Sequence, residues 1–401
     1  MPVTETYDDE PWSDRKLDNY IIRAKEPFNA EARTDRLVDS FVTPTEKHFR
    51  RNHGPIPNLD ARTWEMTVDV VADETCTTRT VGLADLAKLP QYEVVAVLEC
   101  AGNRRDGLKA IKEVSGVTWG AGTASNARWG GCLLRDVLAA AGVPADLGHA
   151  MYAAPRHVEF AAYGDAAEDT HYASSVPLAW VMNPLNMVLV ATTMNGRPLL
   201  RDHGFPARIV APGIIGARWV KWLRRVRVQD SESSSFYQQR DYKILPPVAG
   251  AANCAEFWPR FPALMELSVQ SAICRPAPGE CLRVGRPYVV RGYALSGGGR
   301  AVDRVEVSLD GGQTWALADV FGSGCDRSVE TCSRNWSAPQ WAWVLWAFRI
   351  DSVPAQCTIA SRAWDVGGNT QPDAAVWNYR GVMNNAVYRV SPATVAGAPQ
   401  L

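Results

Sequence analysis

The chain has 401 residues, of which 46% are hydrophobic and 21% are charged, and its formal net charge at pH 7 is −1. A chain of this length usually folds around more than one core, so we expect two domains. The near-neutral charge argues against a general nucleic-acid or membrane-surface binder, and no apolar run reaches the length of a membrane span.

The N-terminal region is acidic and lacks an apolar core. This is not the pattern of a secretory signal peptide, so we expect a cytoplasmic protein. Residues 1–40 show no regular hydrophobic periodicity, and we interpret them as an irregular N-terminal arm.

The region up to residue 250 mixes strand and helix patterns. Residues 94–98 form an apolar run short enough for a buried strand, and a turn-forming sequence follows at residues 99–103. Residues 133–141 have the spacing of an amphipathic helix that stops at Gly142. A polar stretch and a Pro-Pro pair then precede a predicted domain boundary near residue 250. We therefore predict a mixed α/β domain over residues 1–250.

The pattern changes in residues 251–401. Val305, Val307 and Leu309 alternate with polar residues and end in a Gly-Gly turn, which is a hairpin signal. A tryptophan-rich run follows at residues 341–346. Short strands separated by turns predict an immunoglobulin-like β-sandwich, so the whole chain belongs to the α+β class.

Nine cysteines occur, with no CxxC pair, which argues against a disulfide framework or a structural zinc site. Cys325 and Cys332 are close enough in sequence to pair. Cys132 lies on an apolar helix face and is interpreted as a buried, inert thiol. Among the others, Cys100 directly follows the predicted strand and precedes Arg104 and Arg105, a setting that stabilises a thiolate.

Basic residues gather in three segments of this near-neutral chain: residues 47–53, residues 104–112 and residues 201–228. The third segment has seven Arg and Lys residues and one Asp, so its formal charge is 7 − 1 = +6. Scattered surface charges are the simple alternative for any single residue. Because the clusters lie beside Gly and Pro turns, where backbone N–H groups can face an anion, we predict a phosphate-bearing or oxyanion ligand.

Five motifs carry a resemblance to a known family. They are residues 48–55 (HFRRNHGP), 98–105 (LECAGNRR), 201–222 (beginning RDHGFPAR and ending GARWVKW), 240–243 (RDYK) and 377–381 (WNYRG). In this order they resemble the sulfite oxidase family of molybdenum–molybdopterin enzymes, over nearly the whole chain. The resemblance implies a sulfite-oxidase-type molybdopterin domain followed by a β-sandwich dimerisation domain, and hence a homodimer.

The resemblance implies a role for each matching residue. The thiolate of Cys100 would ligate molybdenum, which takes its other sulfur donors from the pterin; a buried inert thiol is the alternative. Arg51, Arg105 and Arg380 would hold the substrate oxyanion, because guanidinium groups match its geometry and stay charged. Trp119 would be a pocket indole, or else an ordinary core residue.

Tyr242 matches the family's active-site tyrosine, with a packing role at the domain boundary as the alternative. An acidic pterin contact falls on Asp165, or on Gly164 if the register shifts by one residue. His48, His157 and His171 are interpreted as structural or surface residues. The remaining predicted contacts with the cofactor are Phe49, Arg50, Arg51, Asn52, His53, His203, Arg208, Trp219, Val220 and Lys221.

The implied function is molybdenum-dependent oxidation of sulfite to sulfate by oxygen-atom transfer. No haem or dinucleotide-binding motif occurs in the sequence, so we expect electrons to pass to dioxygen or to an external carrier such as a cytochrome. The molybdenum domain of a nitrate reductase is the nearest alternative. Arg380 and the 240–243 segment favour sulfite oxidation, whereas residues 381–385 have some nitrate-reductase character. A cofactor-free binding module is the alternative from another class, and it predicts a protein without molybdenum.

Overall fold

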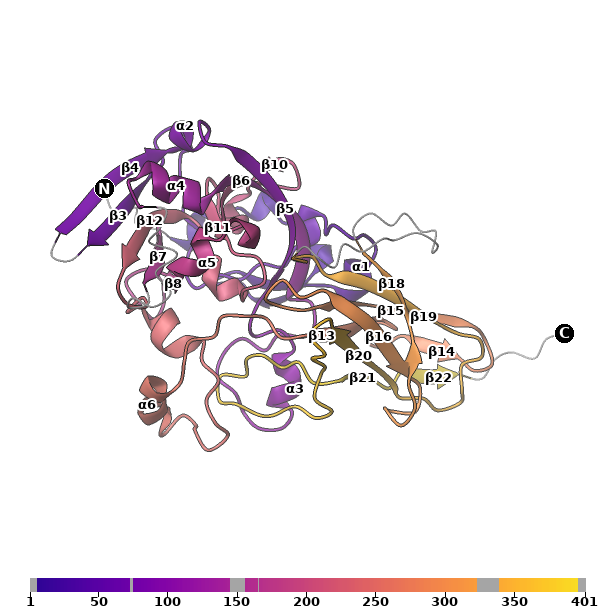
Figure 1. Cartoon of the computed structure of the whole chain (residues 1–401). Helices are drawn as coiled ribbons and strands as arrows, with labels where there is room; N and C mark the ends of the chain where they lie inside the picture. Colours follow the sequence, from indigo (N-terminus) through magenta and orange to yellow (C-terminus); the bar gives the residue numbers. More distant parts are fainter. Residues whose placement is uncertain (1–5, 73–74, 145–155, 165, 323–338, 396–401) are drawn as a thin grey trace.

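The computed structural model describes residues 6–72, 75–144, 156–164, 166–322 and 339–395. The strands of the C-terminal region lie together beside the N-terminal part of the chain (Figure 1). The N-terminal part contains two five-stranded sheets, and the C-terminal part contains two four-stranded sheets. The predicted α+β class is therefore confirmed.

The first five-stranded sheet contains the strand that leads to Cys100. Its order is β10-β9-β6-β5, with β11 paired to β9. The predicted strand at residues 94–98 is present within β5, whose last four residues are all buried. The bounds are β5 (Gln91–Glu99), β6 (Ala124–Leu133), β9 (Leu189–Met194), β10 (Arg197–Pro198) and β11 (Arg208–Val210).

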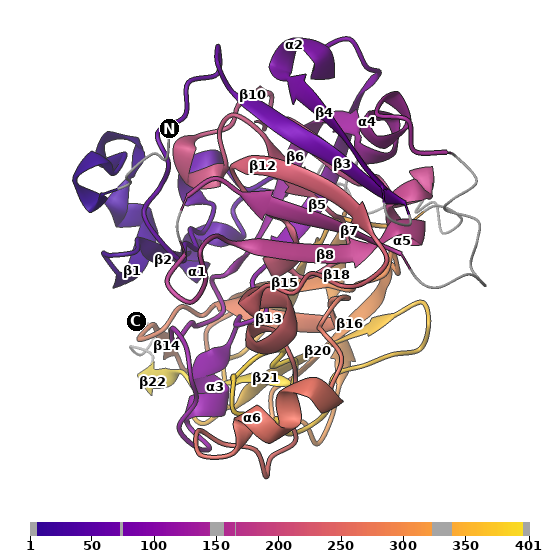
Figure 2. The same cartoon turned by 90° about the vertical axis from the view of Figure 1, so that its left-hand side faces the viewer.

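The second five-stranded sheet has the order β4-β3-β12-β7-β8. Strand β12 pairs in parallel with β3 and antiparallel with β7, so the sheet is mixed. Figure 2 shows these strands crossing the upper part of the molecule, above the sandwich. The bounds are β3 (Glu65–Ala72), β4 (Thr75–Gly82), β7 (His157–Ala162), β8 (Ala173–Pro177) and β12 (Leu223–Gln229).

The helices among the described residues are short. The predicted helix at residues 133–141 is confirmed as α4, which buries Leu134, Val137 and Leu138 on one face. None of the described helices is both long and apolar enough to cross a membrane. The bounds are α1 (Thr34–Leu37), α2 (Leu83–Leu86), α3 (Arg105–Lys109), α4 (Leu134–Ala140), α5 (Leu178–Met182) and α6 (Cys254–Phe257).

The N-terminal arm is more regular than predicted. Strands β1 (Tyr20–Ala24) and β2 (Asn29–Ala32) form an antiparallel hairpin, so the prediction of an irregular arm is wrong for these residues. All four residues of β2 are buried, including the polar Asn29 and Glu31. The sequence of β2 alternates polar and apolar residues, but both of its faces are buried, so it differs from a half-buried strand whose polar side chains face solvent.

The C-terminal part is a β-sandwich with sheets β13-β15-β19-β18 and β17-β16-β20-β21, and strands β14 and β22 form a separate parallel pair. The predicted hairpin is confirmed, because Val307 of β16 pairs with Ala316 of β17. Val290, Val305, Trp346 and Ile359 are buried in its core. The bounds are β13 (Gln270–Arg275), β14 (Cys281–Arg283), β15 (Tyr288–Leu295), β16 (Val302–Ser308), β17 (Ala316–Leu317), β18 (Asp319–Phe321), β19 (Val344–Ile350), β20 (Ile359–Asp365), β21 (Tyr388–Val390) and β22 (Ala393–Val395).

Candidate active site

A cavity lies where four of the five predicted motifs meet. Its wall draws on residues 48–54 near the N-terminus, on the end of β5, on residues 162–172, and on residues 202–222. Most of the predicted metal and cofactor residues line it: Phe49, Arg51, Asn52, His53, Cys100, His203, Arg208, Trp219, Val220 and Lys221, together with the predicted catalytic Tyr242.

Cys100 lies in the cavity wall directly after the last residue of β5. Its backbone N–H donates to the carbonyl oxygen of Thr123 at 3.0 Å, which continues the edge of the β5–β6 ladder. The backbone N–H of Gly102 donates to the Cys100 sulfur at 3.4 Å. The strand therefore fixes the backbone of Cys100, and the turn that follows directs a donor at its sulfur.

Arg105 begins the short helix α3, close to Cys100. Its guanidinium donates to the carbonyl oxygens of Val117 (2.6 Å) and Gly381 (3.0 Å). Burial lowers the pKa of Arg105, while the charge of Cys100 opposes that shift and the charge of Arg51 adds to it. Arg105 does not itself line the described cavity; it lies behind Gly102, whose Cβ position would be 2.6 Å from a guanidinium nitrogen of Arg105.

Arg380 comes from the C-terminal part of the chain and contacts the same region. It donates to the hydroxyl of Ser115 at 2.9 Å and pairs with the carboxylate of Asp241. Burial lowers the pKa of Arg380 to about 10, and the nearby positive charge of Arg105 acts in the same direction. The predicted arginines are thus close enough to influence one another, although only Arg51 is part of the cavity wall.

His53 links the predicted arginine Arg51 to Tyr242. The Nε2 atom of His53 lies 2.8 Å from Arg51 Nη2 and 3.1 Å from the Tyr242 hydroxyl. Burial lowers the pKa of His53 well below its usual value, and the charges of Arg51 and Lys221 add to the shift. Burial also raises the pKa of Tyr242 well above its usual value. At neutral pH, His53 is therefore uncharged and Tyr242 keeps its proton.

A second group of cations lines the cavity around residues 203–221. Arg208 donates to the backbone carbonyls of His203 (3.1 Å) and Trp219 (2.9 Å), and burial lowers its pKa to about 9. The Nζ atom of Lys221 donates to the carbonyls of Arg51 (3.2 Å) and Asp202 (2.9 Å), and burial lowers its pKa well below the usual value. Buried cations that contact carbonyl groups favour an anionic ligand, because the carbonyl groups satisfy their hydrogen bonds but do not neutralise their charge.

The structure corrects the prediction for the side chain of Arg50. Arg50 is not among the described residues that line the cavity, and its guanidinium donates to Asp202 Oδ2 at 2.8 Å, so it is paired with an internal carboxylate. Trp119 is fully buried in the core and is absent from the cavity wall, as in the alternative interpretation. Its indole nitrogen has no hydrogen-bond partner among the described residues. Asp165 lies outside the described residues, whereas Gly164 lines the cavity.

Sequence reasoning missed His48, Tyr172 and Asp202, which all line the cavity. His48 was interpreted as structural, yet its Nε2 atom is buried without a partner in the part of the chain that the structure describes. Its position at the start of the first motif was the available signal. Tyr172, which packs against His53 at 4.9 Å between ring centroids, belongs to no motif. Only the fold could have identified it.

The remaining cysteine predictions have different outcomes. Cys132 is buried and burial raises the pKa of its thiol to about 12, as expected for an inert thiol, but it lies in strand β6 and its predicted place on a helix face is wrong. Cys325 and Cys332 lie outside the described residues. Within the described ranges, no group of three or more His, Cys, Asp or Glu side chains could share a metal ion.

The chain is similar to known protein families, to curated proteins and to a solved structure. An oxidoreductase molybdopterin binding domain matches residues 53–237, and a Mo-co oxidoreductase dimerisation domain matches residues 262–394. Human mitochondrial sulfite oxidase is 43% identical over 396 residues, which are 97% of this chain and 68% of the human protein. The sulfite oxidase of Arabidopsis thaliana is 40% identical over 374 residues, 92% of each chain. The crystal structure of the sulfane dehydrogenase SoxCD from Paracoccus pantotrophus has a TM-score of 0.73 and 25% identity, covering 91% of this chain and 84% of that one.

Proposed function

The chain belongs to the sulfite oxidase family of molybdopterin-binding oxidoreductases, and from this premise we propose that it oxidises sulfite to sulfate with a molybdenum–pterin cofactor bound through Cys100. The observation that carries the proposal is the meeting of Cys100 and Tyr242 with Arg51, Arg208 and Lys221 in one cavity wall. A single sulfur ligand beside several cations suits an anionic cofactor and an anionic substrate.

The cavity residues fit a pterin with a phosphate group. His48 Nδ1 faces the carbonyl of Phe49 at 3.1 Å, so its proton belongs on Nδ1 and its buried Nε2 can accept from an N–H of the ligand. Arg208 and Lys221 would contact the phosphate. The buried Nε2 of His203 likewise has no partner among the described residues and is available to a ligand. When bound, molybdenum supplies the transferable oxygen atom and accepts two electrons.

The arginines bind and orient sulfite in this proposal. Arg51, Arg105 and Arg380 influence one another's electrostatic environment. Their positive charges destabilise one another when no anion is present, and this repulsion is relieved when an oxyanion binds between them. The same charges strengthen the binding of anions but have little effect on neutral molecules, so the site favours anions.

Tyr242 and His53 hold a proton at the cavity wall. Because burial raises the pKa of Tyr242, its hydroxyl remains a hydrogen-bond donor throughout the neutral range. His53, 3.1 Å away, is uncharged and orients that hydroxyl. The single hydroxyl proton of Tyr242 would turn from His53 Nε2 to an oxygen atom of the substrate when sulfite binds, and Tyr242 stays protonated in both arrangements.

We also propose that the two electrons pass to dioxygen or to an external carrier such as a cytochrome, and that two chains form a homodimer. The match of residues 262–394 to a dimerisation domain supports the second part. The first part follows from the redox balance, since oxidation of sulfite to sulfate releases two electrons that must leave the protein before the next turnover.

Steady-state assays test the proposed substrate. We expect the purified protein to oxidise sulfite with an artificial electron acceptor at a rate far above its reduction of nitrate with a reduced dye. A faster reaction with nitrate would assign the chain to the reducing direction instead. A protein that contains no molybdenum and reacts with neither anion would favour the binding-module alternative.

A further inference from the structure

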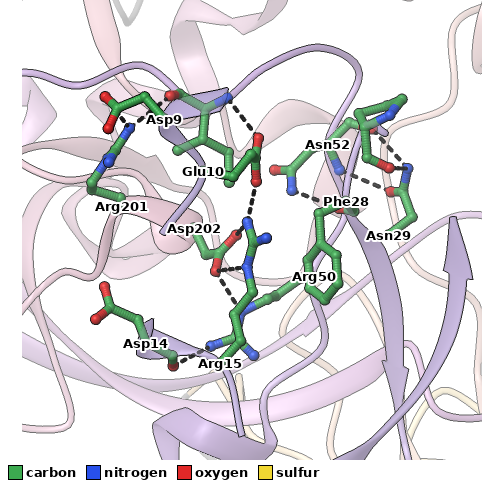
Figure 3. Close-up of polar contacts among 12 residues, drawn as sticks. Asp9, Glu10, Asp14, Arg15, Phe28, Asn29, Arg50, Asn52, Arg201 and Asp202 are labelled. Carbon is green, nitrogen blue, oxygen red and sulfur yellow. Dashed lines mark hydrogen bonds and ion pairs between the residues drawn. The ribbon is translucent and has the colours of Figure 1, made fainter. Parts of the chain in front are cut away.

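A buried cluster of four charges lies behind the cavity wall (Figure 3). It consists of Glu10, Arg15, Arg50 and Asp202, here called the Asp202 cluster. Arg15 donates from Nε and Nη2 to the two carboxylate oxygens of Asp202, at 2.9 Å each, and Arg50 donates to Asp202 Oδ2 at 2.8 Å. Arg15 also pairs with Glu10. These side chains are at most 1% exposed, so the two cations and two anions balance without help from solvent.

Three of the four residues come from a part of the chain that the matched domain models do not include. Those models begin at residue 53, whereas Glu10, Arg15 and Arg50 precede it. Asp202 alone belongs to the cavity wall, next to His203. The N-terminal segment therefore supports the cofactor cavity from behind, through the only acidic residue among its described lining residues.

Several contacts hold the N-terminal segment against the wall of the cavity. Glu10 Oε1 accepts from the backbone N–H of Ile56 at 3.3 Å, and the guanidinium carbon of Arg15 lies 3.8 Å from the ring centroid of Phe28. Phe28 in turn accepts from the side chain of Asn52 through its carbonyl oxygen, at 2.7 Å. Residues 10–28 and the first motif are thus one packed unit.

Two residues held by this packed unit, Asp202 and Asn52, form hydrogen bonds with Lys221. Lys221 Nζ donates to the carbonyl oxygen of Asp202, at 2.9 Å, and to the side chain of Asn52. Arg15 fixes Asp202, whereas Asn29 fixes Asn52 by accepting its backbone N–H at 2.9 Å. A shift of Asp202 would therefore move both a cation and a wall residue of the cavity.

We propose that Arg15 is a positioning residue for the anionic end of the cofactor, because it holds and neutralises Asp202 so that the cavity stays cationic. The inference rests on the proposed function. Without Arg15, the cluster keeps two carboxylates and one arginine, Arg50, which pairs with Asp202, so a net negative charge remains beside the cavity. A negative charge at this place repels a phosphate and draws Lys221 toward protein oxygens instead of the ligand.

Release of pterin from the purified holoenzyme tests this role. Pterin that leaves the protein after dilution is separated by filtration, oxidised and measured by fluorescence. A buried charge left unpaired costs more than the free energy of a tenfold change, so we expect Arg15→Met to release pterin at least about tenfold faster than the wild type. Arg349→Met, which breaks an exposed pair with Asp351 at 2.8 Å, is the matched control and should release pterin at the wild-type rate.

A charge-balanced variant separates positioning from simple loss of packing. Glu10→Gln combined with Arg15→Met leaves Asp202 and Arg50 as a neutral pair. If charge at Asp202 governs retention, the double variant holds pterin longer than Arg15→Met alone. If packing of the N-terminal segment is all that matters, the double variant releases pterin as fast as the single variant or faster, and the inference is overturned.

The possible outcomes distinguish the inference from the proposed function. A wild-type protein without molybdenum and pterin contradicts the proposed function itself. A wild type that holds pterin while Arg15→Met releases it at the same rate overturns only the role of Arg15. If Arg15→Met does not fold, Arg15→Lys takes its place: it keeps the positive charge beside Asp202, so we expect it to hold pterin nearly as long as the wild type, and release at least about tenfold faster from Arg15→Lys contradicts the proposal.

Discussion

Cys100, Arg51, Arg105, Tyr242 and Arg380 come from four of the five motifs and lie in or next to one cavity. Arg105 donates to the backbone carbonyls of Val117 and Gly381, and the hydrogen-bond partners of Arg51 are likewise uncharged groups. Such contacts satisfy hydrogen bonds but do not neutralise charge. The positive charges of Arg51 and Arg105 are therefore available to an oxyanion, whereas Arg380 already pairs with the Asp241 carboxylate and would share its charge with the substrate.

Replacing Arg380 tests the contribution of one guanidinium. A hydrogen bond to a charged group contributes about 1.5–3 kcal/mol, so we expect Arg380→Gln to raise the KM for sulfite by about 10- to 100-fold. Arg240→Gln, at a nearby exposed position, is the control and should leave KM unchanged. Steady-state kinetics measures both. An unchanged KM in Arg380→Gln would remove this residue from the substrate site.

The buried His48 predicts a pH dependence of stability. Burial lowers the pKa of His48 from 6.5 to about 3, so the unfolded chain binds a proton at higher pH than the folded chain does. The stability that neutral His48 provides is complete above pH 6.5 and is lost as the pH falls toward 3, by up to about 1.4 kcal/mol per pH unit.

Chemical denaturation of the wild type and His48→Gln at pH 7 and pH 5 measures this effect. The wild type should lose up to about 2 kcal/mol more than the variant over this interval. Other titrating groups are common to both proteins and cancel in the difference. Parallel pH dependences would show that His48 is accessible to protons in the folded state.

How far the sequence predicts the site depends on how a residue contributes to it. Cys100 and Arg51 stand in motifs with a recognisable chemical role, and the cavity contains both. Arg50 stands in the same motif, but its partner Asp202 is 152 residues away in the chain, so only the fold could show that this side chain is already paired. Tyr172 has no local signal at all.

At the scale of elements, the turn between β5 and α3 organises the site. It brings the Gly102 N–H to the sulfur of Cys100 and places Arg105 behind it. The sequence predicted this turn because an apolar run ends there. It did not predict the β1–β2 hairpin, whose buried strand β2 includes polar Asn29 and Glu31. Local patterns identify elements that bury apolar side chains, but they miss those that bury paired polar ones.

Gly102→Ala tests the close packing of this turn. A Cβ at Gly102 would lie 2.6 Å from Arg105 Nη2 and 3.0 Å from the ring of Trp119, so the guanidinium must move. We expect the KM for sulfite to rise by roughly tenfold, and overpacking to lower stability by about 1–3 kcal/mol. Gly250→Ala has no atom within 4 Å of its Cβ and should change neither quantity. Kinetics and thermal unfolding would detect the difference, and an unchanged KM in Gly102→Ala would contradict the arrangement.

At the scale of the whole molecule, the C-terminal sandwich both completes the site and offers a surface for a second chain. The loop after β20 supplies Arg380 to the site. Tryptophans are enriched in dimer interfaces, but Trp343 and Trp346 are buried within the chain itself. Trp364 of β20 and Trp315, directly before β17, remain partly exposed and are candidates for the interface.

Light scattering at micromolar concentration tests the predicted homodimer. We expect a mass of twice 43.9 kDa for the wild type. Trp364→Ser should weaken the dimer if the β16–β20 sheet forms the interface, whereas Val289→Ser on the other sheet should not. A wild type that is monomeric throughout would contradict the assignment of residues 262–394 to dimerisation.

The ligand role of Cys100 is tested most directly by measuring molybdenum content and sulfite oxidation in the same preparations. The wild type should contain about one molybdenum per chain and oxidise sulfite. Cys100→Ser should lose the sulfite activity and most of the metal, because a hydroxyl is a poorer ligand than a thiolate, whereas Cys254→Ser should keep both. Full molybdenum content and full activity in Cys100→Ser would contradict the account.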